Sequence, residues 1–135
     1  MMTTGCSMGA YHAVNFFLQH PDVFNKVIAL SGVYDARFFV GDCLDDEAIY
    51  QNSPADYIWN QNDGWFIDRY RNADIIVCTG LGAWEQDGLP SFYTLKEAFE
   101  HKNIPTWFAE WGYDVSHDWI WWRKQMPYFL NQLNL

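Results

Sequence analysis

Ser7 is the residue whose surroundings first indicate chemistry. It stands at the centre of residues 5–9, Gly-Cys-Ser-Met-Gly, and an apolar, helix-like run follows directly. In a G-x-S-x-G pattern the serine sits on a strained strand-to-helix turn that keeps its hydroxyl clear of the backbone. Gly5 and Gly9 are expected there because side chains would collide with the neighbouring strand and helix. The turn also aims the N–H of Met8 at a developing oxyanion. The pattern predicts a nucleophilic serine.

A serine nucleophile needs a base and an acid, and the ends of two later strands supply candidates for both. We predict these strands at residues 73–79 and 105–111. In open parallel sheets, catalytic groups gather at the carboxyl ends of the strands. Glu85 and Asp87 follow the first of these strands, and His117 follows the second. We therefore expect Ser7 and His117 to meet an acid that is either Glu85 or Asp87.

Helices and strands alternate around these residues, which is the pattern of a parallel sheet with right-handed crossovers. Besides the two strands above, residues 26–31 form a continuous apolar run that is typical of a buried parallel strand. The predicted helices cover residues 8–19, residues 91–101 with Ser91 as the N-terminal cap, and the stretch from Trp119 onward. In this last helix Trp119 and Trp122 should face the core, and Pro127 should kink or split it. Short helices are expected near 45–51, 54–58 and 64–70, within a long excursion.

Composition excludes several classes of function. Of the 135 residues, 50% are hydrophobic, and the net charge of −9 leaves no basic face for nucleic acid or an anionic membrane surface. No apolar stretch approaches the roughly 20 residues that span a bilayer.

The cysteines Cys6, Cys43 and Cys78 are odd in number and lack metal-ligand spacing. They predict free thiols in a reducing compartment, and Met1–Thr4 lacks a signal peptide's features, so we expect a cytoplasmic protein.

With these residues in place, the chain resembles the C-terminal half of an α/β-hydrolase. Within the α/β-hydrolases, the chain is most similar to the esterase group that includes esterase D-like and feruloyl-esterase-like enzymes. The matching segments are residues 5–11, 20–24, 82–85 and 112–122. The resemblance spans essentially all of residues 1–135 as one α/β-hydrolase-like domain, and His117-Asp118-Trp119 is its most family-specific part.

The resemblance implies hydrolysis of a small-molecule carboxylic ester through an acyl-enzyme, without a metal or organic cofactor. Ser7 would be the nucleophile, His117 the base, and Met8 an oxyanion donor. The order serine, acid, histidine is the one expected of this fold. Relatives tend to place an aspartate where this chain has Gln86, so Glu85 is our first candidate for the acid and Asp87 the second.

The chain also departs from the family at its start. Family members carry several strands before the serine, and an early loop supplies the second oxyanion donor. Only Met1–Thr4 precede the pattern here. We therefore expect the sheet to lack the strand beneath Ser7 and the N-terminal strands beyond it. The open apolar edge should then be covered by an oligomer or a complementing chain.

Two further alternatives stay open. The chain could be a catalytically incomplete esterase remnant or fragment, or a module whose abundant Trp and Tyr bind sugars or aromatic ligands.

Overall fold

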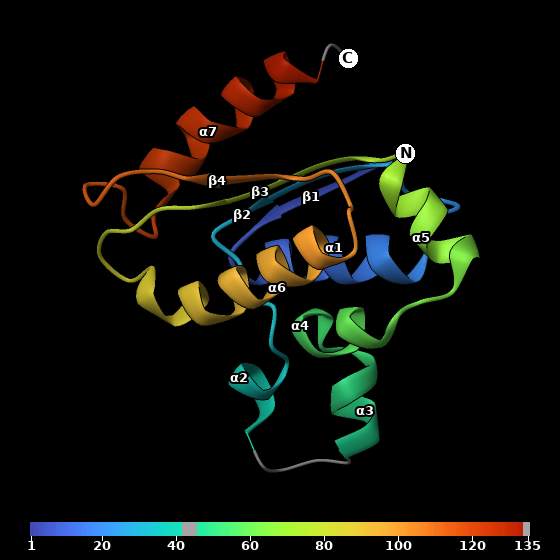
Figure 1. Cartoon of the computed structure of the whole chain (residues 1–135). Helices are drawn as coiled ribbons and strands as arrows, with labels where there is room; N and C mark the ends of the chain where they lie inside the picture. The colour runs from blue at the N-terminus through green and yellow to red at the C-terminus, as the bar shows by residue number, and fades with distance from the viewer. Residues whose placement is uncertain (42–45, 134–135) are drawn as a thin grey trace.

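Four parallel strands form the centre of the molecule, which a computed structural model describes for residues 1–41 and 46–133 (Figure 1). The strands are β1 (Met2–Cys6), β2 (Lys26–Leu30), β3 (Asp74–Thr79) and β4 (Trp107–Glu110), and they lie side by side in the order β1-β2-β3-β4. All three pairings are parallel, with Met2 opposite Lys26 and Lys26 opposite Asp74. Parallel strands end at the same edge of a sheet, so the loops after all four strands meet there.

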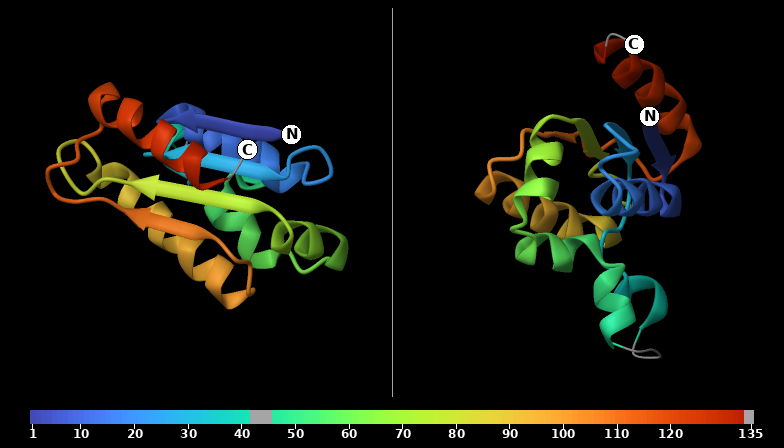
Figure 2. Two further views of the ribbon diagram at one scale, coloured as in Figure 1. Left: turned by 90° about the horizontal axis from the view of Figure 1, so that it is seen from above. Right: turned by 90° about the vertical axis from the view of Figure 1, so that its right-hand side faces the viewer.

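Helices cover both faces of this sheet (Figures 1 and 2). Above it in Figure 1 lies α7 (Trp119–Gln132), and below it lie α1 (Met8–Gln19) and α6 (Leu89–His101). The remaining helices are α2 (Arg37–Val40), α3 (Asp46–Gln51), α4 (Pro54–Tyr57), α5 (Gly64–Arg71) and the 3₁₀ turns η1 (Ile58–Asn60) and η2 (Gln86–Gly88). No helix of residues 1–41 and 46–133 is long and apolar enough to cross a membrane.

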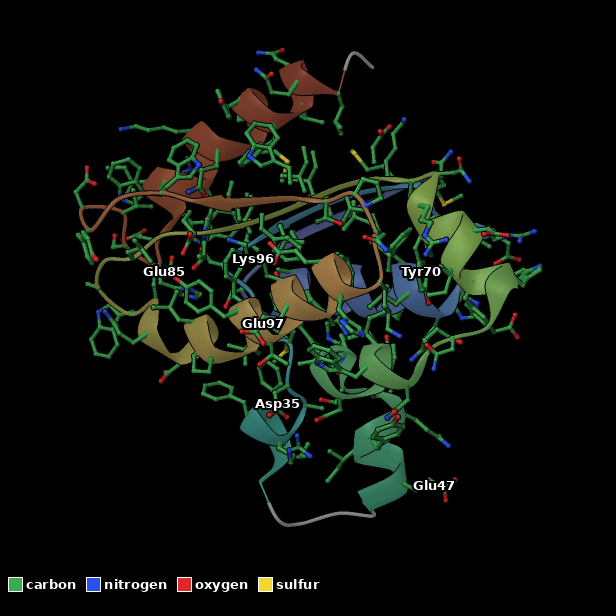
Figure 3. The ribbon with its side chains drawn as sticks, viewed as in Figure 1. Asp35, Glu47, Tyr70, Glu85, Lys96 and Glu97 are labelled. Carbon is green, nitrogen blue, oxygen red and sulfur yellow. The ribbon has the colours of Figure 1, made fainter. Side chains whose placement is uncertain are left out.

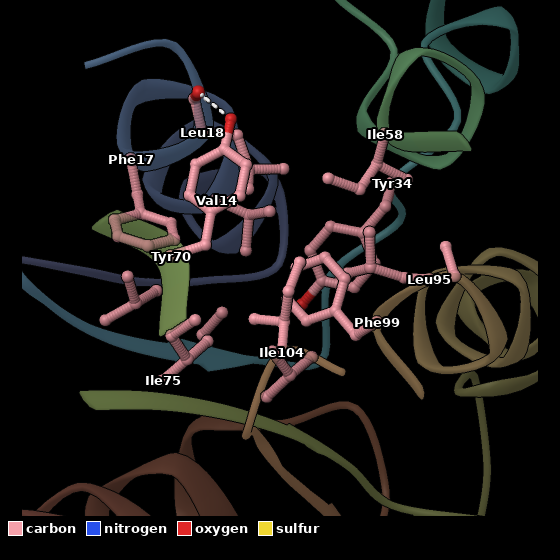
Figure 4. Packing of buried hydrophobic residues seen from close by; sticks show 14 of the residues in the cluster. Val14, Phe17, Leu18, Tyr34, Ile58, Tyr70, Ile75, Leu95, Phe99 and Ile104 are labelled. Atoms are coloured by element: carbon pink, nitrogen blue, oxygen red, sulfur yellow. Dashed lines mark hydrogen bonds between the residues drawn. The ribbon is translucent and has the colours of Figure 1, made fainter. Parts of the chain in front are cut away.

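Side chains of the central strands alternate between two hydrophobic cores. Val27 and Ala29 of β2 pack on the α1 and α6 side, whereas Ile28 and Leu30 pack on the α7 side. Figure 4 shows the larger core, where the Tyr70 hydroxyl donates a hydrogen bond to the Leu18 carbonyl. Both faces of β2 are therefore buried, which explains the continuous apolar run in its sequence.

The main correction concerns the strand beneath Ser7. We expected it to be missing, but Met2–Cys6 forms β1 and pairs with β2 along its whole length. Five residues suffice because the register with Lys26–Leu30 satisfies one edge of the short strand, and α1 packs directly on it. In the sheet of the described residues, β1 is an edge strand.

Three smaller expectations about helices also need correction. The helix α6 begins at Leu89, so Ser91 lies inside it and accepts a hydrogen bond from the Tyr34 N–H instead of capping the helix. Of the kink or split expected at Pro127, the split does not occur, because α7 continues to Gln132. Trp119 does not face the core, because 58% of its surface is exposed. Cys43 lies outside the described residues.

The two glycines around Ser7 have different roles. A Cβ on Gly5 would lie 2.3 Å from the backbone of Gly9, whereas a Cβ on Gly9 would have nothing within 4 Å. Our expectation of a collision at both glycines is therefore correct for Gly5 and wrong for Gly9. Gly5 must be a glycine because β1 and α1 come closest at this point.

This difference yields a matched pair of variants. Gly5→Ala should lower the free energy of unfolding by about 1–3 kcal/mol or more, because overpacking forces backbone apart. Gly9→Ala should be neutral or stabilising by up to about 1 kcal/mol, because alanine favours the helix. Denaturant unfolding of both variants measures this, and equal effects would contradict the packing argument.

Gln125 yields a second prediction. Its side chain is fully buried on the sheet-facing side of α7, and neither amide atom has a hydrogen-bond partner among the described residues. Leaving such a group unpaired costs about 1–3 kcal/mol. Gln125→Met should therefore raise the free energy of unfolding by about 1 kcal/mol or more. The exposed Gln132→Met on the same helix is the control, expected within about 0.5 kcal/mol of the parent.

Candidate active site

Ser7 occupies the sharp turn between β1 and α1. Its φ of 56° and ψ of −123° lie in a region that residues other than glycine rarely adopt. The Ser7 N–H donates to the Leu30 carbonyl of β2 at 2.9 Å, and the Ser7 carbonyl accepts from Ala10 N–H at 3.0 Å. The turn is thus tied to the sheet on one side and to α1 on the other. It presents the hydroxyl at the carboxyl edge of the sheet, as the sequence pattern predicts.

His117 reaches this hydroxyl from the loop after β4. Its Nε2 lies 2.9 Å from Ser7 Oγ, which is hydrogen-bond distance. Its Nδ1 lies 3.7 Å from Glu85 Oε1, within ion-pair range but longer than a hydrogen bond. The three side chains come from three strand ends. Their arrangement allows Nε2 to accept the serine proton while Nδ1 faces a carboxylate.

Two loops bound to each other fix the positions of Glu85 and His117. The His117 N–H donates to the Ala83 carbonyl at 2.9 Å, and the Gly82 N–H donates to the Val115 carbonyl at 2.9 Å. The approach is so close that a Cβ on Gly82 would lie 2.7 Å from the Val115 carbonyl oxygen. Backbone hydrogen bonds therefore hold the loop after β3 against the loop after β4.

Glu85 is buried among hydroxyl groups (Figure 3 labels it beside the β3–α6 loop). Only 2% of its side chain is exposed, against 27% for His117. Ser31 Oγ donates to Oε1 at 2.8 Å, and Thr79 Oγ1 lies 3.2 Å from Oε2. A buried carboxylate needs such partners, because burial without them strongly disfavours its charged form. The environment is therefore built for a carboxylate at this position.

Asp87 takes a different place. It is exposed and lines a cavity of about 220 Å³ that Ser7 and His117 also line. No hydrogen bond or ion pair among the described residues joins Asp87 to His117. Glu85, in contrast, lies within ion-pair range of His117 Nδ1. Of the two acids that the sequence offers, the geometry brings Glu85 to the imidazole.

The same cavity has an apolar wall. Val33, Phe38 and Phe39 line it, together with Trp84, whose side chain is 81% exposed. Trp84 also has a φ of 66°, an outlier for a bulky residue. Strained residues persist where surrounding structure enforces them and often mark ligand sites. The wall can accept an apolar or aromatic group next to Ser7.

Sequence reasoning missed Ser31, Trp122 and α2 as parts of this site. Ser31 directly follows β2, so the same strand-end rule that found Glu85 and His117 could have found it. Trp122 Nε1 donates to Ser31 Oγ at 3.0 Å, a contact across 91 positions that no local pattern indicates. The helix α2, with Phe38 and Phe39, has no regular period in the sequence.

The thiols near the site do not compete with Ser7. Burial raises the pKa of the Cys6 thiol, and burial followed by the charge of Glu85 raises that of Cys78. Both therefore stay protonated at neutral pH, and both are free. Among residues 1–41 and 46–133, no three His, Cys, Asp or Glu side chains gather as metal ligands would.

Known proteins are similar to this chain in family and in fold. The family model Esterase, described as Putative esterase, matches residues 1–133. Among solved structures, a ferulic acid esterase is 22% identical with a TM-score of 0.71, and the match covers 91% of this chain and 46% of that one. An S-formylglutathione hydrolase from Agrobacterium tumefaciens is 16% identical with a TM-score of 0.75, over 96% and 46% of the two chains. No curated protein sequence matches.

The solved structures establish the fold and the extent of the likeness. An S-formylglutathione hydrolase from Staphylococcus aureus repeats the result at 20% identity and a TM-score of 0.65, with 97% of this chain and 49% of that one covered. The chain therefore spans about half the length of these proteins. Its four parallel strands with flanking helices form that part of the α/β-hydrolase fold. Because the family model matches residues 1–133, the chain belongs to the esterase family.

Proposed function

We propose that this chain carries the nucleophile, base and acid of a carboxylic ester hydrolase. The observation that carries the proposal is the 2.9 Å contact between His117 Nε2 and the hydroxyl of Ser7. It occurs on a strained turn that keeps the hydroxyl exposed to a cavity. Family membership supports ester chemistry, and an acid at 3.7 Å from Nδ1 supports the assignment of Glu85.

The reaction would proceed through an acyl-enzyme. As Ser7 Oγ attacks the ester carbonyl carbon, its proton passes to His117 Nε2, and the carbonyl oxygen becomes negatively charged. The C–O bond to the alcohol then breaks while Nε2 returns the proton to the leaving oxygen. Water, deprotonated by the same nitrogen, attacks the acyl carbon and releases the acid and Ser7. The Glu85 carboxylate stabilises the imidazolium in both steps.

Met8 would supply one donor to the oxyanion. It is the first residue of α1, and the first N–H groups of a helix have no acceptor within the helix. The N-terminal end of the helix dipole also favours negative charge there. The apolar wall of Val33, Phe38 and Trp84 would bind the acyl or alcohol group of a small ester. The free thiols support a cytoplasmic location.

Covalent labelling tests the nucleophile. A fluorophosphonate probe should label the folded protein, and Ser7→Ala should remove the label because the hydroxyl is the atom phosphonylated. Met8→Ala keeps the backbone N–H and is the control, which should still be labelled. A folded wild-type protein that the probe does not label would show that Ser7 is not activated.

A second candidate is a hydrolase whose site is completed by another segment, in an oligomer or a complementing chain. The position of β1 at an edge of the described sheet favours it, because edge strands offer unpaired backbone groups. Loss of one oxyanion donor costs about 10²–10³-fold in rate. Labelling without turnover of p-nitrophenyl acetate would support this candidate. Turnover that His117→Ala removes would show that these residues suffice.

Substitution of the two acids tests which one serves His117. Glu85→Gln should lower the rate of Ser7 labelling by about 10³-fold or more, because the imidazolium loses its carboxylate. Asp87→Asn should change it by less than about threefold, as expected for a surface substitution. Both substitutions replace a carboxylate by its amide, so the two variants differ only in the position of the change. Circular dichroism of each variant checks that it is folded. A larger loss of labelling rate in Asp87→Asn than in Glu85→Gln would show that Asp87 is the acid that serves His117.

A further inference from the structure

Ser31 and Trp122 form a buried chain of hydrogen bonds that ends on Glu85. Trp122 Nε1 donates to Ser31 Oγ at 3.0 Å, and Ser31 Oγ donates to Glu85 Oε1 at 2.8 Å. This is the same oxygen that lies 3.7 Å from His117 Nδ1. The exposed fractions of Ser31, Trp122 and Glu85 are 4%, 6% and 2%, so water does not compete for these contacts.

The direction of the chain is fixed by what each group can do. An indole N–H only donates, and a carboxylate only accepts. A serine hydroxyl has one proton, so while it accepts from Trp122 that proton points to Glu85. Trp122 therefore orients the Ser31 hydroxyl toward the carboxylate.

The backbone of Ser31 shows that its side chain is needed. Its φ is 57°, a left-handed conformation that glycine adopts without strain and serine does not. A hydrogen bond of 2.8 Å from the Ser31 N–H to the Cys78 carbonyl holds this conformation. A glycine would satisfy the same backbone bond. What serine adds is the hydroxyl on Glu85.

Trp122 also contacts the imidazole directly. The rings of His117 and Trp122 meet edge to face, with centroids 4.9 Å apart and planes at 88°. One residue of α7 therefore touches the base and, through Ser31, the acid. A shift of α7 would change both partners of Ser7 together.

We propose that Ser31 and Trp122 are positioning residues that hold the Glu85 carboxylate toward His117, an inference that rests on the proposed function. When His117 takes the proton of Ser7, the charge on the ring grows, and a carboxylate already oriented needs no rearrangement to stabilise it. The Ser31 hydroxyl and Thr79 restrain its two oxygens. Ser31 and Trp122 would thus affect the chemical step and leave substrate affinity unchanged.

Ser31→Gly is the decisive variant, because it removes the hydroxyl and suits the left-handed backbone, and circular dichroism checks that the variant is folded. The maximal rate of Ser7 phosphonylation at saturating fluorophosphonate should fall about tenfold, the effect of losing one hydrogen bond to a charged group. The probe concentration at half-maximal rate should not change. Tyr70→Phe removes another buried hydroxyl, which donates to the Leu18 carbonyl away from the site (Figure 3), and should label at the wild-type rate. Wild-type labelling of Ser31→Gly would overturn the proposal.

A double-mutant cycle tests whether Trp122 acts through Ser31. Trp122→Phe keeps a ring against His117 but removes the donor, and it should slow labelling in the wild-type background. In the Ser31→Gly background, Trp122→Phe should have little further effect on labelling, because the Ser31 hydroxyl that connects Trp122 to Glu85 is absent. If the two substitutions slow labelling independently, so that their rate effects multiply, Trp122 does not act through Ser31 and the proposal is overturned.

Proton NMR of the His117 Nδ1–H separates this proposal from the proposed function. The resonance should shift in Ser31→Gly and stay in place in Tyr70→Phe. A folded wild type that no probe labels would contradict the proposed function, and the NMR comparison would still decide the positioning role. An unchanged Nδ1–H resonance in Ser31→Gly would overturn it.

Discussion

The backbone conformation of Ser7 is the constraint on which the rest of the structure depends. A φ of 56° in a residue with a side chain costs about 1–3 kcal/mol and persists only where neighbours enforce it. The neighbours are β2, which accepts the Ser7 N–H, and α1, whose Gly9 backbone lies against Gly5. Packing of α1 on β1 and β2 thus stabilises the turn at Ser7, and this turn fixes the position of the Ser7 hydroxyl.

The second half of the site depends on a buried carboxyl group. Ser31 Oγ donates to Glu85 Oε1 at 2.8 Å and Thr79 Oγ1 lies 3.2 Å from Oε2, and both residues stand at the ends of neighbouring strands. The bonded loops after β3 and β4 hold His117 over this carboxylate. Formation of the sheet therefore brings together Ser7, Ser31, Thr79, Glu85 and His117, because each lies at or just after the end of a strand.

Strand ends were also the part of the site that could be predicted from sequence. The G-x-S-x-G pattern indicated Ser7, and the rule that parallel strands end at one edge indicated His117 and an acid at Glu85 or Asp87. The same reasoning was wrong where packing overrides local signals. Pro127 should break a helix at a cost of about 3 kcal/mol, but Trp122 and Phe129 anchor α7 to the sheet on either side of it. The four residues Met1–Thr4 before the pattern looked too few for a strand, but Met2–Cys6 pairs with β2 along its whole length.

The sequence by itself determined the parallel α/β class and the candidates for a triad, which are Ser7, His117 and either Glu85 or Asp87, because both follow from local patterns and chain order. Tertiary structure decided which acid faces His117. Glu85 and Asp87 are two residues apart, and only the fold turns one into the hydroxyl-lined interior and leaves the other at the cavity rim. It also decided that Ser31 and Trp122 share the site, because their contact spans 91 positions and depends on how α7 lies on the sheet.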